Sequence, residues 1–557
     1  MEAVTQGQSI PALAAKYKLE KATALSFSAD LGTPVGLFEK LADKQDYAFL
    51  FESTEGDSRL ARYSFLSCDP CMTVAFKDGV VTKCDQGGKS SQAVTDPLAY
   101  LQDTLEQFRL LAQAAIQRAL GSLDEKGSGP NTSATASASS DTSTSAIARA
   151  SASASGHSEL AKFLQELPFV GGLVGFMGYG ACRYMSGIAQ QDLDPTSVPD
   201  GYYGLYDSVI VFDHQFRRVI LLSLRGEQHA AQMLETMLGP GNLKPLKLDL
   251  KPLSSEEVFE QVTTSVTRQT FLDTVEAAKE YLREGQAFQI VVSQRFSMPA
   301  AAPPINIYRM LQATNPSPYA YFLKFPDFVY LGSSPETFVQ CQNKKLMLRA
   351  IAGTRRRGQG AEQDALLGAE LRSDEKEMAE HRMLVDLGRN DLGRVSTPGS
   401  VKVGELACLS KYTHVMHLET EITSRLSPEQ TAFSAFQSCF PAGTVSGAPK
   451  VRAMQLLSAL EPERRGIYSG AVGYFDMRGS MDGAIAIRSA LIKNGVAYAN
   501  AGAGIVYDSQ PEAEYEETKN KAKGVLSAII LAQNVGLDQR DGDRQTNGDR
   551  QTDGDRP

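Results

Sequence analysis

Residues 501–523 read AGAGIVYDSQPEAEYEETKNKAK, and this stretch organises the interpretation of the whole chain. An apolar run at 497–501 leads into it and predicts a strand. The small residues 502–504 let the backbone approach a ligand closely, with N–H groups available to an anion. Residues 508–511, DSQP, are typical of a turn that opens a helix. We therefore expect a strand, a backbone cradle for an anion, a turn and a helix in succession.

The predicted helix places several charged side chains on one face. Glu514, Glu517 and Lys521 are spaced i, i+3 and i+7, which makes them neighbours along that face. Two carboxylates beside an anion-binding backbone indicate a metal ion and an anionic substrate held together. A solvated acidic helix with ion pairs such as Glu517 to Lys521 explains the same pattern. On this stretch alone both interpretations stay open.

A second stretch, residues 369–391, offers a matching set of acids. Its sequence, AELRSDEKEMAEHRMLVDLGRND, is helical in pattern, and Asp374, Glu377 and Glu380 recur every three residues. They lead into an apolar segment, where unpaired acids are costly unless a metal binds them. Ligands that are all oxygen suit Mg²⁺, which keeps several waters and often bridges to an anionic substrate. Two helices that each offer a Glu pair could clamp one such ion.

The composition excludes several classes of function. Lys plus Arg number 56 and Asp plus Glu 65 among 557 residues, so the formal net charge is −9, which argues against nucleic-acid binding. No apolar run is long enough for a membrane span. Seven scattered cysteines and an N-terminus without a signal-peptide pattern predict a cytoplasmic protein. The C-x-x-C at Cys68 and Cys71 has no second pair, so we interpret it as coincidental.

The chain divides into two structured regions. Short apolar runs predict strands at 47–51, 63–66, 72–76, 208–212 and 218–224. Residues 127–156 consist mainly of Ala, Ser and Thr, which cannot bury a core, so this insertion is predicted to be disordered. The near-repeats at the end predict a disordered tail at 539–557. We expect an N-terminal region at 24–235 and a second region at 265–534.

Polar motifs follow one another in the second region. They are GSSPE ending at Glu336, IAGTRRRG at 351–358, KYTHVMH ending at His417, PAGTVSGAPK at 441–450, and the single residues Tyr468 and Arg488. GSSPE places a carboxyl just after a strand and turn, and IAGTRRRG is a turn of small and basic residues that suits an anion. Each motif alone also has an ordinary explanation, since His417 can be a satisfied core residue and Arg488 an ion-pair partner.

Taken together, these motifs closely resemble the chorismate-utilising enzymes, and among them the large subunits (component I) of anthranilate synthase. The resemblance covers nearly all of residues 24–534. The motifs SPE, IAGTRRRG, AEHRMLVDLGRND, GTVSGAPK, AIRSAL, AGAGIVYDS and EYEETKNKAK are specific in combination. The resemblance implies an α+β fold in which large antiparallel sheets pack as a sandwich, with covering helices.

The resemblance assigns roles to individual residues. The implied catalytic residues are Glu336 as general acid for the departing C4 hydroxyl, His417 for the later loss of pyruvate, and Thr444 next to the site. The implied Mg²⁺ ligands are Glu380 and Glu517. Glu377 and Glu514 are implied to contact these ligands or to reach the ion through a water molecule. The implied chorismate contacts are Gly353, Thr354, Tyr468, Arg488, Gly502, Ala503, Gly504 and Lys521.

The implied reaction is the first step of tryptophan biosynthesis. Ammonia adds at C2 of chorismate with loss of the C4 hydroxyl, and pyruvate then leaves to give anthranilate. Hydroxide is a poor leaving group and needs a protonated carboxyl, while a metal and an arginine neutralise the two substrate carboxylates. The chain has no glutaminase nucleophile signature. The resemblance therefore implies a glutamine amidotransferase subunit (component II) as ammonia source, in a heterotetramer.

Two positions separate this chain from sister enzymes. Aminodeoxychorismate synthases usually carry Lys where Ala352 stands, for covalent attack on the ring. Isochorismate and salicylate synthases carry Lys where Gln289 stands, as a base for water. With neither lysine present, ammonia addition at C2 is the expected chemistry.

The N-terminal region resembles the family's regulatory part, which binds tryptophan as a feedback inhibitor. The implied inhibitor contacts are Glu52 and Ser53 in the LFES motif, Pro318, Tyr319, Ala320, Val472, Gly473 and Tyr474. Ala320 departs from the larger residue often found there, and Ala350 replaces a common Pro.

Two other functions compete with this interpretation. An aminodeoxychorismate synthase would use the same substrate but would not form anthranilate. A non-catalytic, tryptophan-responsive binding protein would require the loss of catalytic residues. The presence of Glu336, Glu380, His417, Arg488 and Glu517 argues against the second.

Overall fold

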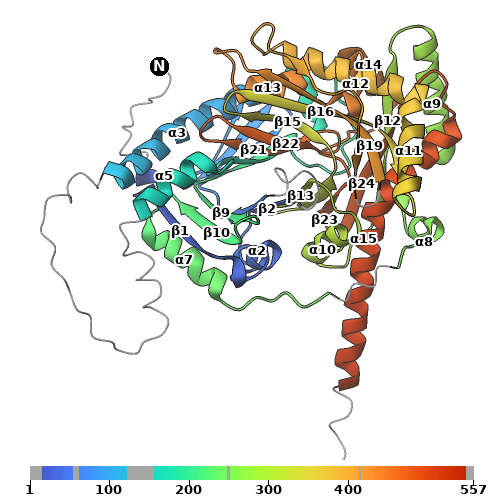
Figure 1. Cartoon of the computed structure of the whole chain (residues 1–557). Coiled ribbons are helices and arrows are strands. Elements are labelled where there is room, and N and C mark those ends of the chain that lie inside the picture. Colours follow the sequence, from blue (N-terminus) through green and yellow to red (C-terminus); the bar gives the residue numbers. More distant parts are fainter. Residues whose placement is uncertain (1–14, 54–61, 122–155, 247–250, 413–414, 547–557) are drawn as a thin grey trace, which may run out of the picture.

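The computed structural model describes residues 15–53, 62–121, 156–246, 251–412 and 415–546. Within these ranges the chain forms two large antiparallel sheets of twelve strands each, with helices around them (Figure 1). The predicted α+β class with packed antiparallel sheets is confirmed.

The first sheet contains the strands that surround residues 502–504. Its order is β1 (Thr23–Ser28), β10 (Arg218–Ser223), β9 (Ser208–Asp213), β3 (Tyr63–Cys68), β2 (Ala48–Glu52), β13 (Tyr319–Lys324), β14 (Val329–Ser334), β23 (Ser489–Lys493), β24 (Val496–Ile505), β12 (Gln289–Pro299) and β11 (Thr263–Thr264), with β20 (Gly447–Ala448) beside β12.

The second sheet carries the IAGTRRRG segment. Its order is β17 (Lys402–Val403), β19 (Val415–Arg425), β16 (Lys345–Arg356), β15 (Thr337–Gln342), β22 (Met481–Ile485), β21 (Ala471–Asp476), β7 (Gly172–Met177), β8 (Gly201–Tyr206), β4 (Met72–Lys77), β5 (Val80–Asp85) and β6 (Gly88–Ala93), with β18 (Cys408–Lys411) beside β19.

Both sheets combine strands from the two regions defined by sequence. In the first sheet β2 pairs with β13, and in the second sheet β7 pairs with β21. The regions 24–235 and 265–534 therefore interleave and share both sheets instead of forming separate ones.

The five short strands predicted in the N-terminal region are confirmed as β2, β3, β4, β9 and β10. Strand β2, AFLFE, shows the physical reason. Phe49 belongs to the core between the two sheets, while Ala48 and Leu50 pack under the helices on the other face. A strand that lies between two packed layers needs apolar side chains on both faces.

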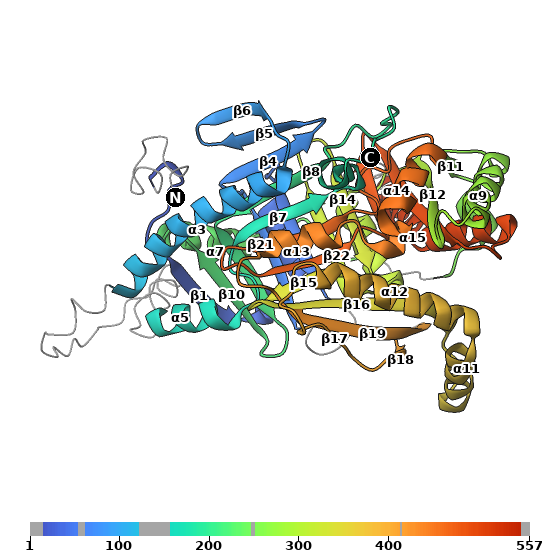
Figure 2. The ribbon, with the colours of Figure 1, turned by 90° about the horizontal axis from the view of Figure 1, so that it is seen from above.

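The helices cover the sheets in groups. Helices α2 (Pro34–Ala42), α7 (Glu227–Leu238), α8 (Ser255–Phe259), α10 (Pro304–Thr314) and α15 (Pro511–Thr546) share a core with the first sheet. Helices α9 (Arg268–Arg283) and α14 (Lys450–Leu460) pack against β12. Helices α3 (Pro97–Gly121), α12 (Glu375–Gly393) and α13 (Ala432–Cys439) contact the second sheet, and α5 (Gly156–Glu166) lies beside β1 (Figure 2). The short α6 (Cys182–Ser186) follows β7.

One predicted helix is divided in two. The single helix expected over 369–391 is in fact the end of α11 (Ala361–Ser373) followed by α12, and Figure 2 shows the two at an angle. The break lies at Asp374, whose extended backbone has ψ 109° and whose carboxylate accepts a hydrogen bond from Glu377 N at 3.1 Å. Asp374 is therefore the N-cap of α12 rather than one of three acids along a continuous face.

Two segments predicted to bind an anion, 502–504 and IAGTRRRG, are parts of strands. Residues 502–504 lie inside β24, where Gly502 pairs with Ser293 of β12, and IAGTRRRG continues β16 as far as Arg356. The glycine allows close packing of neighbouring groups, since a Cβ on Gly502 would lie 2.9 Å from the carbonyl oxygen of Val292. In β24, Gly502 therefore serves close strand packing.

The two segments predicted to be disordered have different outcomes. Residues 127–155 of the insertion lie outside the described residues, and Gly156 begins α5. Helix α15 continues to Thr546 and so includes residues 539–546 of the predicted tail, because extending an existing helix needs no new nucleus. Residues 547–557 lie outside the described ranges.

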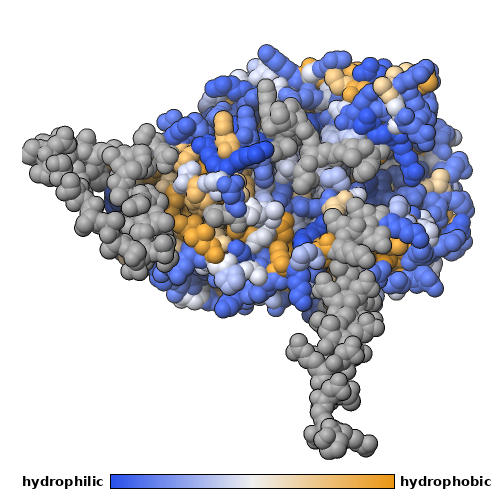
Figure 3. Space-filling model, turned by 60° about the horizontal axis from the view of Figure 1, so that its bottom comes forward, coloured by the Kyte–Doolittle hydropathy of each residue, from blue (hydrophilic) through white to orange (hydrophobic). Residues whose placement is uncertain are grey.

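Hydrophilic residues cover most of the face shown in Figure 3, with hydrophobic residues in separate patches between them. Among the described residues, none of the helices combines the length and apolar character that crossing a membrane requires.

Candidate active site

Glu336 lies between β14 and β15, where the chain passes from the first sheet to the second. Its backbone oxygen accepts a hydrogen bond from Ile485 N at 3.0 Å, which fixes the segment against the end of β22. Burial raises the pKa of the Glu336 carboxyl to about 7, although the Thr444 hydroxyl and the charges of Lys521 and Arg488 lower it. Thr444 Oγ1 is buried and faces this carboxyl without completing a full hydrogen bond. A carboxyl with this pKa can hold a proton near neutral pH and release it.

Arg488 and Lys521 bring positive charge to the same place from two elements. The Arg488 guanidinium donates to the backbone oxygen of Lys521 at 2.6 Å. Lys521 Nζ donates to the backbone oxygen of Gly502 at 3.0 Å and pairs with Glu517 at 2.6 Å. The backbone of Arg488 is left-handed, with φ 52°, a conformation that non-glycine residues rarely adopt and that often occurs at functional sites. Burial lowers the pKa of Arg488.

Tyr468 completes this side of the site. Its hydroxyl lies close to Gly502, since a Cβ on that glycine would be 3.0 Å from the hydroxyl oxygen. The structure thus brings Thr444, Arg488 and Lys521 close to the Glu336 carboxyl. Gly502 lies next to this group because its backbone oxygen accepts from Lys521, and the Tyr468 hydroxyl lies close to Gly502.

A β-bulge presents His417. Strands β16 and β19 pair regularly except at Gly353 and Thr354, which together oppose His417. Gly353 has φ +65°, the left-handed conformation that such a bulge needs and that glycine adopts without strain. His417 Nδ1 lies 2.8 Å from the carbonyl oxygen of Gly353 and 3.2 Å from Thr354 Oγ1. Because a carbonyl only accepts, Nδ1 carries a proton, and in the neutral imidazole Nε2 is then an acceptor.

Two basic residues next to the bulge have acidic partners. Arg355 pairs with Asp374 at 3.0 Å and with Glu377 at 3.3 Å, and Arg357 donates to Asp364 at 2.9 Å. Arg355 and Arg357 thus anchor helices α11 and α12, and the anion-binding role of this segment stays a prediction.

The acids of α12 and α15 face each other across the site. Burial raises the pKa of Glu380, and the charges of Glu377 and Glu517 raise it further. Burial also raises the pKa of Glu514, and Glu517 adds to this effect. Carboxylates that disfavour each other's ionisation provide oxygen ligands that a cation would stabilise.

Within the described ranges, no group of three or more acidic, histidine or cysteine side chains is close enough to hold a metal by itself. Mg²⁺ usually takes only one or two carboxylates and completes its shell with water and substrate oxygens. The pair of Glu380 and Glu517 fits this habit, and the ion pair of Glu517 with Lys521 is the contact that a cation would replace. The metal role of these residues stays a prediction.

Gln289 and Ala352 border the same region. The Gln289 amide donates to Glu380 at 3.3 Å and lies against Gly504, where a Cβ would be 2.7 Å from its nitrogen. Ala352 is buried and immediately precedes the bulge at Gly353. Both positions that distinguish the sister enzymes are therefore next to predicted site residues.

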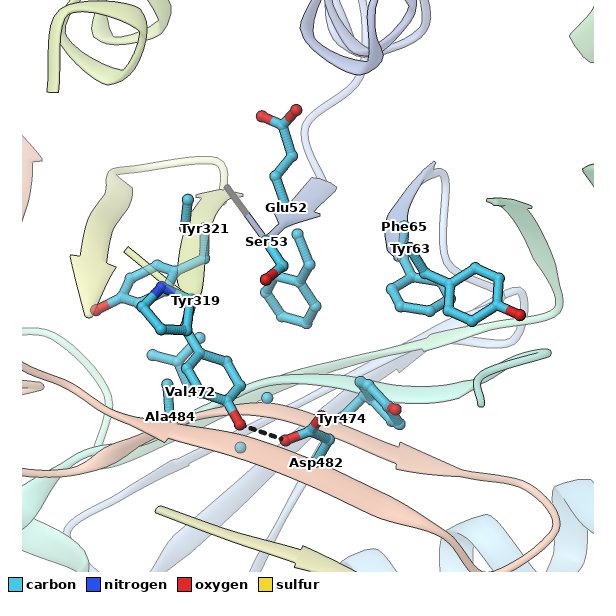
Figure 4. Close-up of a pocket in the computed structure, with 15 residues that line it drawn as sticks. Glu52, Ser53, Tyr63, Phe65, Tyr319, Tyr321, Val472, Tyr474, Asp482 and Ala484 are labelled. Carbon is cyan, nitrogen blue, oxygen red and sulfur yellow. Dashed lines mark hydrogen bonds between the residues drawn. The ribbon is translucent and has the colours of Figure 1, made fainter. Parts of the chain in front are cut away.

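A second pocket lies between the two sheets (Figure 4). All eight predicted inhibitor contacts line it, namely Glu52, Ser53, Pro318, Tyr319, Ala320, Val472, Gly473 and Tyr474. The aromatic rings of Tyr63 and Phe65 complete its wall. The hydroxyl of Ser53 is buried and has no hydrogen-bond partner in the described part of the chain, so it is available to a ligand.

The carboxylate of Glu52 does not serve this pocket. It accepts hydrogen bonds from Tyr308 at 2.8 Å and Gln312 at 2.7 Å on α10, and in Figure 4 it points away from the other lining residues. Glu52 therefore contributes through its backbone, and its side chain anchors the end of β2 to the helix.

Asp482 is the acidic residue of this pocket that sequence reasoning missed, together with the lining residues Tyr63, Phe65, Tyr321, Gly483 and Ala484. Its carboxylate accepts from the Tyr319 hydroxyl at 3.2 Å, drawn in Figure 4, and from Gln340 at 3.0 Å. Burial raises its pKa to about 6. The available signal was an acid inside the short, otherwise small and apolar strand MDGAI, where an unpaired carboxylate is unfavourable.

Comparison with known proteins identifies the family. Residues 107–527 match the chorismate binding enzyme family. The chain is 37% identical to anthranilate synthase component 1 of Synechocystis over 90% of its length and 94% of that protein. The component 1 of Pseudomonas putida is also 37% identical, over 91% of this chain and 94% of that one. The crystal structure of anthranilate synthase component I from Streptococcus pneumoniae has a TM-score of 0.67 at 35% identity, covering 89% of this chain and 98% of that one.

The chain belongs to the anthranilate synthase component 1 family. The matched segment 107–527 contains Glu336, His417 and Arg488, whereas Ser53 lies before it. The whole-chain similarity to component 1 relatives extends beyond that segment, so the inter-sheet pocket lies within a chain that is similar throughout.

Charge removal at Lys521 should change the proton affinity of Glu336. Lys521→Met should raise the pKa of Glu336 above about 7, because the positive charge that favours the carboxylate is lost. Infrared spectroscopy of the protonated carboxyl band during a pH titration measures this shift, with Glu336→Gln to assign the band. Lys519→Met is the matched control, since Lys519 pairs with Glu516 on the same helix. An unmoved titration in Lys521→Met would contradict the described electrostatics.

Proposed function

We propose that this protein converts chorismate and ammonia into anthranilate and pyruvate, as the large subunit of an anthranilate synthase. The observation that carries the proposal is the Glu336 carboxyl, with a pKa of about 7 beside Thr444, Lys521 and Arg488. A reaction that expels a hydroxyl near neutral pH needs an acid that is still protonated there. The similarity to component 1 relatives supports the same activity.

Each residue has a defined task in this reaction. Ammonia forms a bond to C2, the ring double bonds shift, and the C4 oxygen leaves as water with the proton of Glu336. The added nitrogen gives up one proton. The C2 proton then leaves to a base, the bond from C3 to the enolpyruvyl oxygen breaks, and the enolpyruvyl methylene carbon takes up a proton, which gives the aromatic ring and pyruvate. The free Nε2 of His417 is an acceptor suited to this second stage. Arg488 binds a substrate carboxylate and limits its rotation.

The acids of α12 and α15 would hold Mg²⁺. Glu380 and Glu517 would be its protein ligands, with Glu377 and Glu514 behind them. When bound, the ion would neutralise the ring carboxylate of chorismate and fix its orientation. The raised pKa values of Glu380 and Glu514 support a cation here, since positive charge favours their ionised forms.

Ammonia rather than water is the proposed nucleophile. Attack by water needs a base, and the Gln289 amide is not basic. Ammonia has a free lone pair once the ammonium proton is gone. Ala352 offers no amine for covalent attack on the ring. The ammonia would come from a glutamine amidotransferase partner, in a heterotetramer.

The product decides between this function and its rivals. The chain alone, with chorismate, Mg²⁺ and an ammonium salt, should form anthranilate, detected by fluorescence and chromatography. Glutamine in place of the ammonium salt should give no product without a partner. Glu336→Gln should lower kcat by about 10²-fold or more, the usual contribution of a general acid. Aminodeoxychorismate, isochorismate or salicylate as the main product would overturn the proposal.

Magnesium dependence should reside in the two facing helices. Glu380→Gln or Glu517→Gln should weaken Mg²⁺ binding at least about tenfold, because each removes a charged ligand. Isothermal titration with Mg²⁺ and the Mg²⁺ dependence of the rate both measure this. Glu516→Gln is the matched control, because Glu516 pairs with Lys519 and is not among the residues assigned to the metal. Equal Mg²⁺ affinity in all three variants and the parent would rule out this site.

We also propose that tryptophan binds between the sheets as a feedback inhibitor. The pocket combines aromatic walls with the free hydroxyl of Ser53 and the carboxylate of Asp482, which suits an aromatic amino acid with its ammonium group. Strand β22 links this pocket to the active centre, because Ala484 lines the pocket and Ile485 N holds Glu336.

A bulky residue at Ser53 should abolish this inhibition. Ser53→Phe should raise the inhibition constant for tryptophan more than about tenfold by filling the pocket, with kcat nearly unchanged. Inhibition curves and calorimetric tryptophan binding measure the effect. Ser90→Phe, on the exposed strand β6, is the control for a new surface phenylalanine. Parental sensitivity in Ser53→Phe would mean that the inhibitor binds elsewhere.

A further inference from the structure

One buried arginine joins several segments of the candidate active site. Arg465 lies in the loop between α14 and β21, and only 2% of its side chain is exposed. Its guanidinium donates to both carboxylate oxygens of Glu461 at 2.7 Å each, to the carbonyls of Val445 at 2.7 Å and Val291 at 2.6 Å, and to Ser469 Oγ at 3.1 Å. These five contacts use the five N–H donors of an arginine.

The contact with Val445 controls the position of Thr444. Val445 ends the short 3₁₀ turn η3 (Gly443–Val445), so a hydrogen bond to its carbonyl fixes the turn that carries Thr444. Thr444 faces Glu336 and lowers its pKa. Arg465 thus reaches the general acid through one turn of backbone.

The contacts of Arg465 with β12 support its pairing with β24, the strand that carries Gly502 and Gly504. Val291 pairs with Gly504, and its carbonyl accepts from Arg465. Glu461 also accepts from the backbone N–H and the hydroxyl of Ser293, both at 2.9 Å, and Ser293 pairs with Gly502. The Arg465–Glu461 pair therefore fixes the strand opposite both glycines.

Two tyrosine rings lie beside the guanidinium. The ring centre of Tyr179 is 4.6 Å from it and that of Tyr468 is 6.0 Å. Tyr468 places its hydroxyl against Gly502, and Tyr179 comes from the N-terminal region. The same cation thus orders a predicted substrate contact and anchors the region that precedes β8.

We propose that Arg465 is a positioning residue for the reaction, which sets Thr444 against Glu336 and Tyr468 against Gly502. A buried ion pair is not by itself a source of stability, because desolvation offsets its attraction. The planar fork of arginine reaches separated carbonyls at fixed angles, which a lysine ammonium cannot do. The proposal rests on the proposed function, since it assumes Glu336 as the acid.

Arg465→Lys tests this role because it keeps the positive charge but loses the planar guanidinium that reaches several acceptors at once. In the ammonia-dependent anthranilate assay, kcat should fall at least about tenfold while KM for chorismate changes less than about threefold. The fall in kcat on the alkaline side should move to higher pH, because Thr444 no longer lowers the pKa of Glu336. A purely structural role would lower the thermal-unfolding midpoint without moving the pH profile.

The matched control is Arg295→Lys. Arg295 of β12 pairs with Glu463 of the same loop at 2.8 Å, with both side chains 12% exposed. Its salt bridge to Glu463 joins the same two segments but does not include the turn that carries Thr444. The kcat and the pH profile should therefore remain near those of the parent. An unshifted profile in Arg465→Lys, or equal effects of both variants, would overturn the proposal.

A double-mutant cycle with Thr444→Ala makes the test independent of stability. If Arg465 acts through Thr444, the losses in kcat are strongly non-additive, whereas additive losses refute it. Should Arg465→Lys fail to fold, the milder Glu461→Gln replaces it in the same cycle, with the same two outcomes. An inactive parent protein would refute the proposed function on which this inference rests, whereas an active parent with an unshifted profile in Arg465→Lys refutes the inference alone.

Discussion

The antiparallel pairing of β21 with β22 is the constraint on which both pockets depend. The pairs Val472–Ala484 and Tyr474–Asp482 place the floor of the inter-sheet pocket on these two strands. Just before β21 the chain carries Tyr468, and just after β22 it carries Arg488. A shift of this pair by one residue would move every side chain to the opposite face. One register thus aligns the pocket with the active centre.

Charge balance distinguishes Glu336, the proposed acid, from the neighbouring carboxyls that are proposed to bind a cation. Burial raises the pKa of Glu336, Glu380 and Glu514 alike. For Glu336, burial raises the pKa to about 7 even though Thr444, Lys521 and Arg488 favour the ionised form. Lys521 also favours the ionised forms of Glu380 and Glu514, but the negative charge of Glu517 opposes it. The same residue type thus serves two purposes through its neighbours.

The sequence was sufficient for elements whose side-chain pattern has a single physical solution. Strand β2 is apolar on both faces, so its position between two layers was predictable from AFLFE. The break at Asp374 was not, because an aspartate is equally compatible with an acidic helix face and an N-cap. The close strand pairing of the glycines of β24 was not predictable either, since the partner strand that needs close approach is over 200 residues away along the chain, at Ser293. Asp482 was missed because its partners, Tyr319 and Gln340, meet it only in the fold.

The contacts of Gln289 indicate that the proposed choice of nucleophile depends on more than one residue. Its amide donates to Glu380 at 3.3 Å and fills the space beside Gly504. A lysine there would meet the same carboxylate, which favours the charged ammonium, and a charged ammonium cannot take a proton from water. A metal bound to Glu380 would oppose that ammonium and push its pKa down. Activation of water at this position would therefore depend on three things together: the side chain of residue 289, the ionisation of Glu380 and any cation bound there.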